Sequence, residues 1–155
     1  MPLKEEDIKR KLGKLGSQLG FKCKNEYRLK MPGVDRYIGY VDHVWFLTLS
    51  LQALQEVDAQ IEIQLPAVGF EITTKLDKLW NPKEMKGDIT NLRILAPALG
   101  VLVIPSRDML EKEAKARGST WHEKLDDYLE ALKRMAAPIR IKILYVDNNL
   151  NFTWE

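Results

Sequence analysis

The chain has very few of the residues that form disulfides or bind zinc. Cys23 is the only cysteine among 155 residues, so neither an internal disulfide nor a site of several thiolates can form. The only histidines are His43 and His122, too few for a histidine-rich zinc site. These absences make zinc chemistry a poor expectation and leave the carboxylates as the main candidates for metal ligands.

Long hydrophobic runs are also absent. No apolar run approaches the roughly 18 residues that a membrane span needs. The first residues carry Lys4, Glu5 and Glu6 where a signal peptide would have an apolar core. The sequence therefore predicts a cytoplasmic protein that does not contact a membrane. Its length and its 45% hydrophobic and 30% charged composition predict one globular domain over residues 1–155.

Charge is nearly balanced overall but unevenly distributed. The formal net charge is +2, yet residues 1–36 carry ten Lys or Arg against five Asp or Glu, a surplus of +5. The rest of the chain therefore has a net charge of −3. A basic amino-terminal part suggests a polyanionic partner such as nucleic acid, whose phosphates it would neutralise. A solvated helix face rich in lysine explains the same surplus equally well.

Hydrophobic periodicity predicts an α/β domain. Apolar residues at helical spacing indicate a helix over residues 4–19, and three extended segments follow. The stretch 50–64 is ambiguous between a short helix and an excursion between strands. The expected elements are strands at 21–29, 37–49, 65–74, 99–104 and 139–146, and helices at 87–95, from 105 to about 118, and from 120. Residues 75–86 read as a loop. Successive strands followed by alternating helices and strands predict a single three-layer domain with a mixed central sheet flanked by helices.

Two acidic residues occur where strands should be apolar. Asp42 lies within the run 40–46 and Glu71 within the run 67–73, both rich in branched and aromatic residues. A buried carboxylate needs a hydrogen-bonding partner, a proton or a metal ion. On neighbouring strands the two would suit Mg²⁺, which prefers oxygen ligands and needs only one or two protein carboxylates. The alternative is two separate acids, each paired with a lysine or arginine.

A series of short motifs follows the amphipathic helix. In chain order they are Gly20-Phe21, Glu26-Tyr27, Val41-Asp42-His43-Val44-Trp45, Val68-Gly69-Phe70-Glu71-Ile72-Thr73, Gly87-Asp88-Ile89-Thr90-Asn91-Leu92 and Val101-Leu102-Val103-Ile104-Pro105. Over residues 4–146 this series resembles the PD-(D/E)xK nucleases, which have the restriction-endonuclease-like fold. The resemblance implies that Asp42 and Glu71 hold Mg²⁺ or Mn²⁺ for phosphodiester hydrolysis.

The superfamily motif has a lysine two residues after its second acid, but in this chain the residue two positions after Glu71 is Thr73. The resemblance fails at this position. If the strand persists, Glu71, Thr73 and Lys75 point to one face, and Lys75 becomes the substitute catalytic residue. Lys86 is a second substitute. For both lysines the alternative is plain solvent exposure. The Thr73 hydroxyl can still hydrogen-bond a phosphate or a metal-bound water.

Two further residues are candidates for the site. The superfamily often adds a third acid, and Glu26 would be that metal ligand; the alternative is an edge-strand ion pair with Lys24 or Arg28. Backbone amides near Gly87, at the expected start of a helix, could receive a phosphate oxygen. Asn91 lies one turn further on. Thr73, Lys86 and Asn91 are thus the residues expected to contact nucleic acid.

The sequence therefore predicts a metal-dependent nuclease-like protein that acts on DNA in preference to RNA and is compatible with a homodimer. One rival is a decayed nuclease fold that serves as a nucleic-acid- or protein-binding module, which Thr73 favours. Another is an unrelated α/β interaction domain with two ion-paired acids, which would bind no metal.

Overall fold

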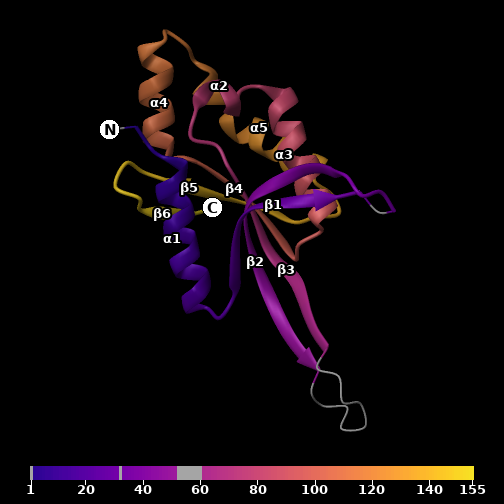
Figure 1. Ribbon diagram of the computed structural model, residues 1–155. Helices are drawn as coiled ribbons and strands as arrows, with labels where there is room; N and C mark the ends of the chain where they lie inside the picture. The colour runs from indigo at the N-terminus through magenta and orange to yellow at the C-terminus, as the bar shows by residue number, and fades with distance from the viewer. Residues whose placement is uncertain (1, 32, 52–60) are drawn as a thin grey trace.

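A six-stranded mixed sheet forms the centre of the protein (Figure 1). The computed structural model describes residues 2–31, 33–51 and 61–155. The strands are β1 (Lys22–Lys30), β2 (Tyr37–Leu51), β3 (Ile61–Ile72), β4 (Leu99–Pro105), β5 (Ile141–Val146) and β6 (Phe152–Trp154). The helices are α1 (Glu5–Gln18), α2 (Leu76–Leu79), α3 (Pro82–Leu95), α4 (Arg107–Ala116) and α5 (Leu125–Met135), with a 3-10 turn η1 (Trp121–Lys124).

The strands lie in the sheet in the same order as in the chain. β1, β2 and β3 form an antiparallel meander, and β5 and β6 are also antiparallel. β3, β4 and β5 run parallel, because α3 and α5 carry the chain back across the sheet between them. The predicted α/β class with a mixed sheet is therefore confirmed.

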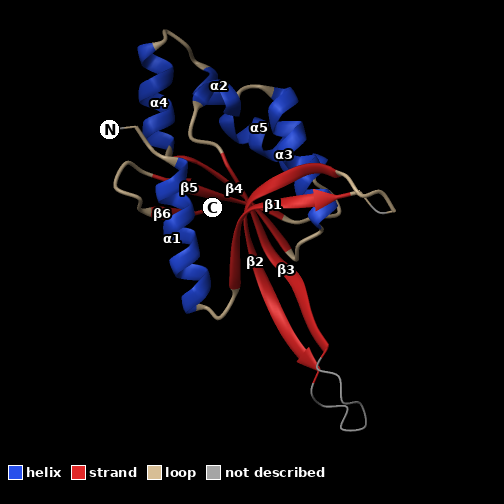
Figure 2. Cartoon of the chain, viewed as in Figure 1, coloured by secondary structure: helices blue, strands red, loops and turns tan. Residues whose placement is uncertain are grey.

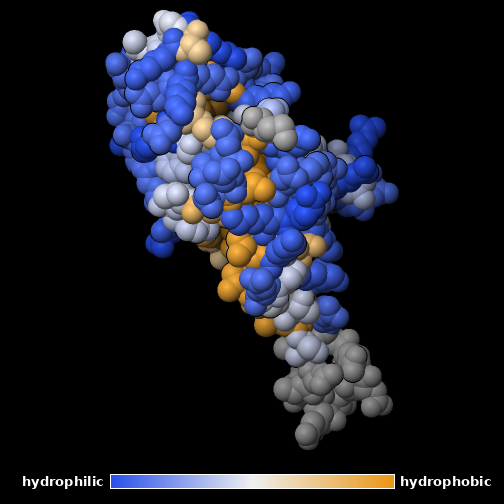
Figure 3. Space-filling view, turned by 90° about the vertical axis from the view of Figure 1, so that its left-hand side faces the viewer, coloured by the Kyte–Doolittle hydropathy of each residue, from blue (hydrophilic) through white to orange (hydrophobic). Residues whose placement is uncertain are grey.

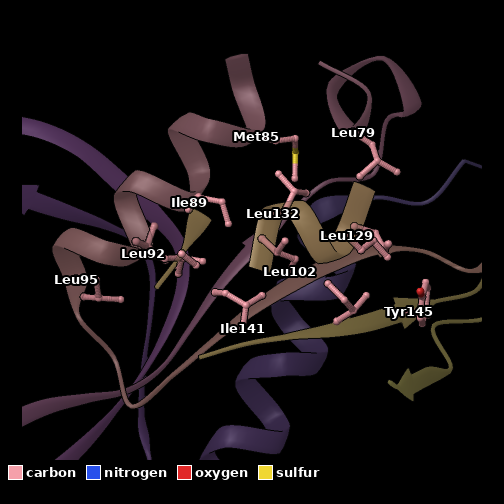
Figure 4. Close-up of a cluster of buried hydrophobic side chains, with 14 of the residues drawn as sticks. Leu79, Met85, Ile89, Leu92, Leu95, Leu102, Leu129, Leu132, Ile141 and Tyr145 are labelled. Atoms are coloured by element: carbon pink, nitrogen blue, oxygen red, sulfur yellow. The ribbon is translucent and has the colours of Figure 1, made fainter. Parts of the chain in front are cut away.

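Helices cover both faces of the sheet (Figure 2). On one face, α1 packs against the sheet through Ile8 and Leu12. On the other, α2, α3 and α5 enclose the larger core, part of which is shown in Figure 4. The central strand β4 is almost completely buried between the two layers, which agrees with its uninterrupted apolar run. Among the described residues, no helix is long and apolar enough to cross a bilayer.

The segment between β3 and β4 differs from the prediction. The expected loop over residues 75–86 contains α2, and α3 begins at Pro82 rather than near Gly87. The Asn81 side chain caps α3 by accepting a hydrogen bond from the Lys83 N–H at 3.1 Å. Proline suits the first helical position because that position needs no N–H donor. Pro82, within the segment expected to be a loop, thus begins a helix.

One other expectation is corrected, and one open alternative is partly decided. The helix predicted from Thr120 starts as the 3-10 turn η1, and the Thr120 side chain makes no capping bond. Within the ambiguous stretch 50–64, residues 50–51 and 61–64 continue β2 and β3. Residues 52–60 lie outside the described residues.

Candidate functional site

Asp42 and Glu71 lie side by side on β2 and β3. The antiparallel register pairs His43 with Phe70, so the next step along the same register brings Asp42 opposite Glu71. Both residues are buried, with 5% and 2% of their surface exposed. Asp42 Oδ2 accepts a hydrogen bond of 2.7 Å from the Ile72 N–H, which fixes the carboxylate against β3. The structure thus brings together the two acids that the sequence singled out.

The helical segment after β3 adds a third carboxyl group and a cation. Asp88 of α3 is 8% exposed, and Lys78 of α2 places its Nζ 3.3 Å from Asp88 Oδ2. The four side chains line one cavity of about 450 Å³, which we call the acidic cavity. The residues around this cavity are Ile38, Gly39, Tyr40, Asp42, Glu71, Lys78, Gly87, Asp88, Thr90 and Asn91.

Burial and mutual repulsion raise the pKa of each of these carboxyl groups above its ordinary value. Burial raises the pKa of Asp42 from its ordinary 3.8 to about 6, despite the opposing Ile72 hydrogen bond. The pKa of Glu71 lies well above its usual range, because the group is buried and faces the charges of Asp42 and Asp88. Burial likewise raises the pKa of Asp88, although Lys78 opposes this. Burial would lower the pKa of Lys78, but the carboxylates outweigh it and the pKa is raised.

The unpaired oxygen of Glu71 suggests how such a site would be satisfied. Glu71 Oε1 is buried and receives no hydrogen bond from any described N–H or O–H donor, although the Asp88 carboxyl group lies close enough to share a proton with Glu71. A buried acceptor of this kind costs free energy until a proton or a cation occupies the position. The donor set is all oxygen, which suits Mg²⁺ or Mn²⁺. No group of three or more His, Cys, Asp or Glu that could hold a metal ion was found within the described ranges. Mg²⁺, however, is commonly bound through only one or two carboxylates and keeps several waters.

We expect the Asp42→Asn variant to be more stable than the natural protein at pH 8 in EDTA. The folded protein keeps the Asp42 proton up to about pH 6, whereas the unfolded chain releases it near 3.8. Folding therefore takes up a proton in this window, so stability falls as pH rises through it. The cost of the charged form above this window is about 3 kcal/mol. Asparagine avoids that cost, keeps an acceptor for the Ile72 N–H, and should raise Tm by about 5 °C or more.

Thermal unfolding at pH 4 and pH 8 measures this effect. The gain in Tm should be large at pH 8 and nearly vanish at pH 4. Asp35→Asn is the matched control, because the Asp35 carboxyl is 95% exposed and its loss should leave Tm within experimental scatter. A Tm for Asp42→Asn that is unchanged or lower at pH 8 would contradict the conclusion that the charged, buried Asp42 carboxylate destabilises the folded protein.

Lys75 does not share a face with Glu71, so that expectation is wrong. β3 ends at Ile72, and the alternation of side chains that would have aligned the two residues ends with it. Lys75 is the N-cap position of α2, is exposed, and lines a different cavity beside Leu3 and Met109. The lysine in the acidic cavity is instead Lys78.

Thr73 also lies away from the acidic cavity. Its side chain is 2% exposed, and its Oγ1 lies 3.8 Å from the Met85 sulfur as a hydrogen-bond donor. Its backbone N–H donates to the Val103 carbonyl at 2.8 Å. The hydroxyl is thus directed into the core, and in this arrangement it does not contact a phosphate in the cavity.

Glu26 forms an ion pair, with a partner other than those expected. It has a positive φ of 48°, although the pairing of β1 with β2 keeps the same register on both sides of it. Its Oε1 accepts a hydrogen bond from Lys9 Nζ at 3.3 Å, and Lys9 also pairs with Glu5 at 3.2 Å. Glu26 does not line the acidic cavity, whereas the charge of Glu5 contributes to the raised pKa of Asp42. Of these two acids, Glu5 has the stronger influence on Asp42.

Asn91 lines the cavity, but Lys86 does not. Asn91 Nδ2 donates to the Tyr40 carbonyl at 3.2 Å and packs against Gly39, where an added Cβ would lie 2.5 Å from Asn91 Oδ1. Lys86 is exposed, and its carbonyl accepts from the Thr90 hydroxyl. Gly87 lies inside α3, so its amide is not at a free helix start and the phosphate-binding role expected there is wrong.

The sequence interpretation missed Asp88 and Lys78. Asp88 had a detectable signal: Met85, Ile89 and Leu92 form the buried stripe of α3, and an acid three residues after Met85 falls on that stripe. This is the same anomaly that identified Asp42 and Glu71. Lys78 had no such signal, because it lies on a four-residue helix that the sequence did not predict.

Comparisons of this chain with models of known protein families, with curated proteins and with solved structures found no match.

Proposed function

We propose that this protein is a metal-dependent nuclease with a restriction-endonuclease-like fold, in which Asp42 and Glu71 hold Mg²⁺ or Mn²⁺. The observation that carries the proposal is the buried, unpartnered Glu71 Oε1 beside a second buried carboxylate in a solvent-connected cavity. Two carboxylates with raised pKa values are unfavourable there unless a cation or a proton compensates them. The bound ion would supply an activated water and would offset charge on the phosphate.

In this proposal the protein side chains position the reacting groups. Asp42 is held by the Ile72 N–H, so its free oxygen points to a fixed place. Lys78 is anchored by Asp88 at 3.3 Å and supplies the positive charge that the motif lysine would otherwise give. Because the Lys78 side chain is 34% exposed, its ammonium group can reach a phosphate at the mouth of the cavity. Asp88 acts as a positioning residue for Lys78.

A basic and aromatic surface beside the cavity supports nucleic acid as the substrate. Tyr37 is 56% exposed, and both Arg28 and Lys30 lie over its ring, at 5.4 Å and 5.5 Å from the centroid. These three residues line a second cavity of about 550 Å³ that also borders α3. Tyr40, which is 51% exposed, lines the acidic cavity on the same strand. Cations that bind phosphates and rings that stack on bases are the elements of single-strand recognition.

We expect the double variant Arg28→Ala/Lys30→Ala to bind nucleic acid more weakly and with less dependence on salt. If each cation neutralises one phosphate, the slope of log K against log salt should become shallower by about 1.5. Fluorescence anisotropy of a labelled single-stranded nucleic acid, recorded in Ca²⁺ at several salt concentrations, measures both the affinity and its salt dependence. The charge-matched control is Lys112→Ala/Lys115→Ala on α4, which should keep the slope of the natural protein. An unchanged slope for the first variant would place the nucleic acid elsewhere.

The direct test is cleavage of a panel of single-stranded, duplex and branched DNA and of RNA. Reactions contain Mg²⁺ or Mn²⁺, and matched reactions contain EDTA. Cleavage that depends on the metal supports the proposal. Absence of cleavage on every substrate, together with no metal binding by calorimetry, would overturn it.

A non-catalytic binding module is the second candidate, and Thr73 favours it. The motif lysine is missing, and the threonine in its place hydrogen-bonds within the core. Lys78 is already paired with Asp88, which satisfies part of its charge. This candidate predicts nucleic-acid binding, with or without bound metal, and no cleavage of any substrate in the panel.

A further inference from the structure

β2 and β3 extend beyond the rest of the sheet as a two-stranded arm. β1 last pairs with β2 at Phe46, and β4 first pairs with β3 at Val68. Within the described ranges, residues 47–51 and 61–65 therefore pair only with each other, and we call these ten residues the arm. In Figure 1 the arm projects downward, away from the helices. Its two outer edges carry backbone groups that no other described strand uses.

One face of the arm is apolar. The register places Leu47 opposite Leu65 and Leu49 opposite Ile63, so these four side chains share a face. Their exposed fractions lie between 37% and 45%. The alternating positions are polar: Thr48, Ser50, Glu62 and Gln64. This strict alternation is the pattern of a sheet that is covered on one face, yet nothing in the described part of the chain covers this one.

The apolar face continues from the part of the sheet that α1 covers. Trp45 precedes Leu47 by two residues on β2, stacks on Phe21 at 5.5 Å and donates a hydrogen bond to the Leu12 carbonyl of α1. α1 ends at Gln18, and Leu19 just after it is 66% exposed. Figure 3, which views the molecule from the α1 side, shows hydrophobic residues gathered along the arm below the polar body.

We propose that this face is a homodimer interface, occupied by the same face of a second copy of the chain. The face has no charged side chain, and Glu62 is the only charged residue in the arm. Its surface therefore does not suit a polyanion. Exposed sheet edges are usually protected by charges, prolines or bulges; here Pro66 and a bulge lie at the base of the arm, and within the arm only Glu62 serves this purpose. A two-fold axis would match each apolar face with an identical one.

The area of the patch fits a reversible dimer. The four aliphatic side chains expose roughly 300 Å² per chain, about the size of the largest apolar patches on soluble proteins, which are often functional. Pairing two copies would bury about 600 Å² of apolar surface, which with the surrounding polar atoms falls in the range of weak, transient interfaces below about 1,200 Å². We therefore expect a dimer that dissociates at low protein concentration. Nothing in this inference requires that the proposed nuclease activity exist.

Sedimentation velocity over a wide range of protein concentration, without metal or nucleic acid, tests the proposal. The natural protein should shift from monomer to dimer as its concentration rises. Ile63→Lys and Leu49→Lys should each raise the dimer dissociation constant by at least about tenfold, because each would bury an unpaired charge in the interface. Thr48→Lys, on the polar face of the same arm, is the matched control and should leave the constant within about twofold.

The outcomes separate clearly. A natural protein that stays monomeric at every concentration would overturn the proposal and leave the face for another partner. A dimer that Ile63→Lys and Leu49→Lys do not weaken would also overturn it. Circular dichroism verifies that each variant is folded, and Ile63→Ser replaces any lysine variant that is not. Ile63→Ser should weaken the dimer in the same direction.

Discussion

Under the proposed function, Glu71→Gln should abolish metal-dependent cleavage, lowering kcat by a factor of about 10³ or more. Loss of a metal-binding carboxylate removes several kcal/mol of transition-state stabilisation, and each 1.4 kcal/mol is about tenfold in rate. Glutamine keeps the shape of the side chain in a position that is only 2% exposed. The loss of activity should therefore come without loss of structure. Initial rates with Mg²⁺ and with Mn²⁺, on the best substrate of the panel, measure the effect.

The same substitution distinguishes lost chemistry from misfolding. Because burial and neighbouring charge raise the pKa of Glu71, removing its ionisable group should increase Tm at pH 8 in EDTA. Activity falls while stability rises, a combination that a folding defect cannot produce. Glu62→Gln is the matched control on β3, since Glu62 is exposed on the arm and outside the cavity. Retention of full activity by Glu71→Gln would show that the cleavage arises elsewhere.

Lys78→Ala should lower kcat by about 10²–10³-fold while the protein still binds metal. A preorganised charge that stabilises the transition state is typically worth this much. Lys78 lies in the cavity of Asp42 and Glu71, so in the proposed function its ammonium group is the one that stabilises charge on the phosphate. Steady-state kinetics gives kcat and KM separately, and calorimetry with Mn²⁺ establishes that the metal site survives. Lys78→Arg keeps the charge and should recover part of the rate.

Lys75→Ala is the decisive comparison, because Lys75 is the residue that the sequence alone nominates for this role. It lies in a different cavity and is exposed, so its loss should change kcat by less than about threefold. A large loss in Lys75→Ala with none in Lys78→Ala would mean that the end of β3 rearranges when substrate binds. It would also refute the assignment of Lys78.

Several features of the fold could be predicted from local pattern. The buried β4 strand followed from an uninterrupted apolar run, and the mixed sheet followed from the order of elements. Asp42 and Glu71 were recognisable as candidate site residues because burying an acidic side chain in an apolar strand costs free energy, whatever the strand packs against. Asp88 could have been found by the same test, applied with a helical instead of a strand period.

The sequence by itself thus determined that this chain builds a mixed α/β sheet and buries two acids in adjacent strands, because hydrophobic period and the cost of burying charge are properties of short segments. Only the tertiary structure decided which lysine side chain lies beside these two acids. β3 ends at Ile72, and the burial of Leu76 and Leu79 in the core turns the next residues into α2, so that Lys78 instead of Lys75 enters the cavity. Which of the two lysines enters the cavity depends on packing between residues distant in the chain. The local sequence pattern around the two lysines carries no information about that packing.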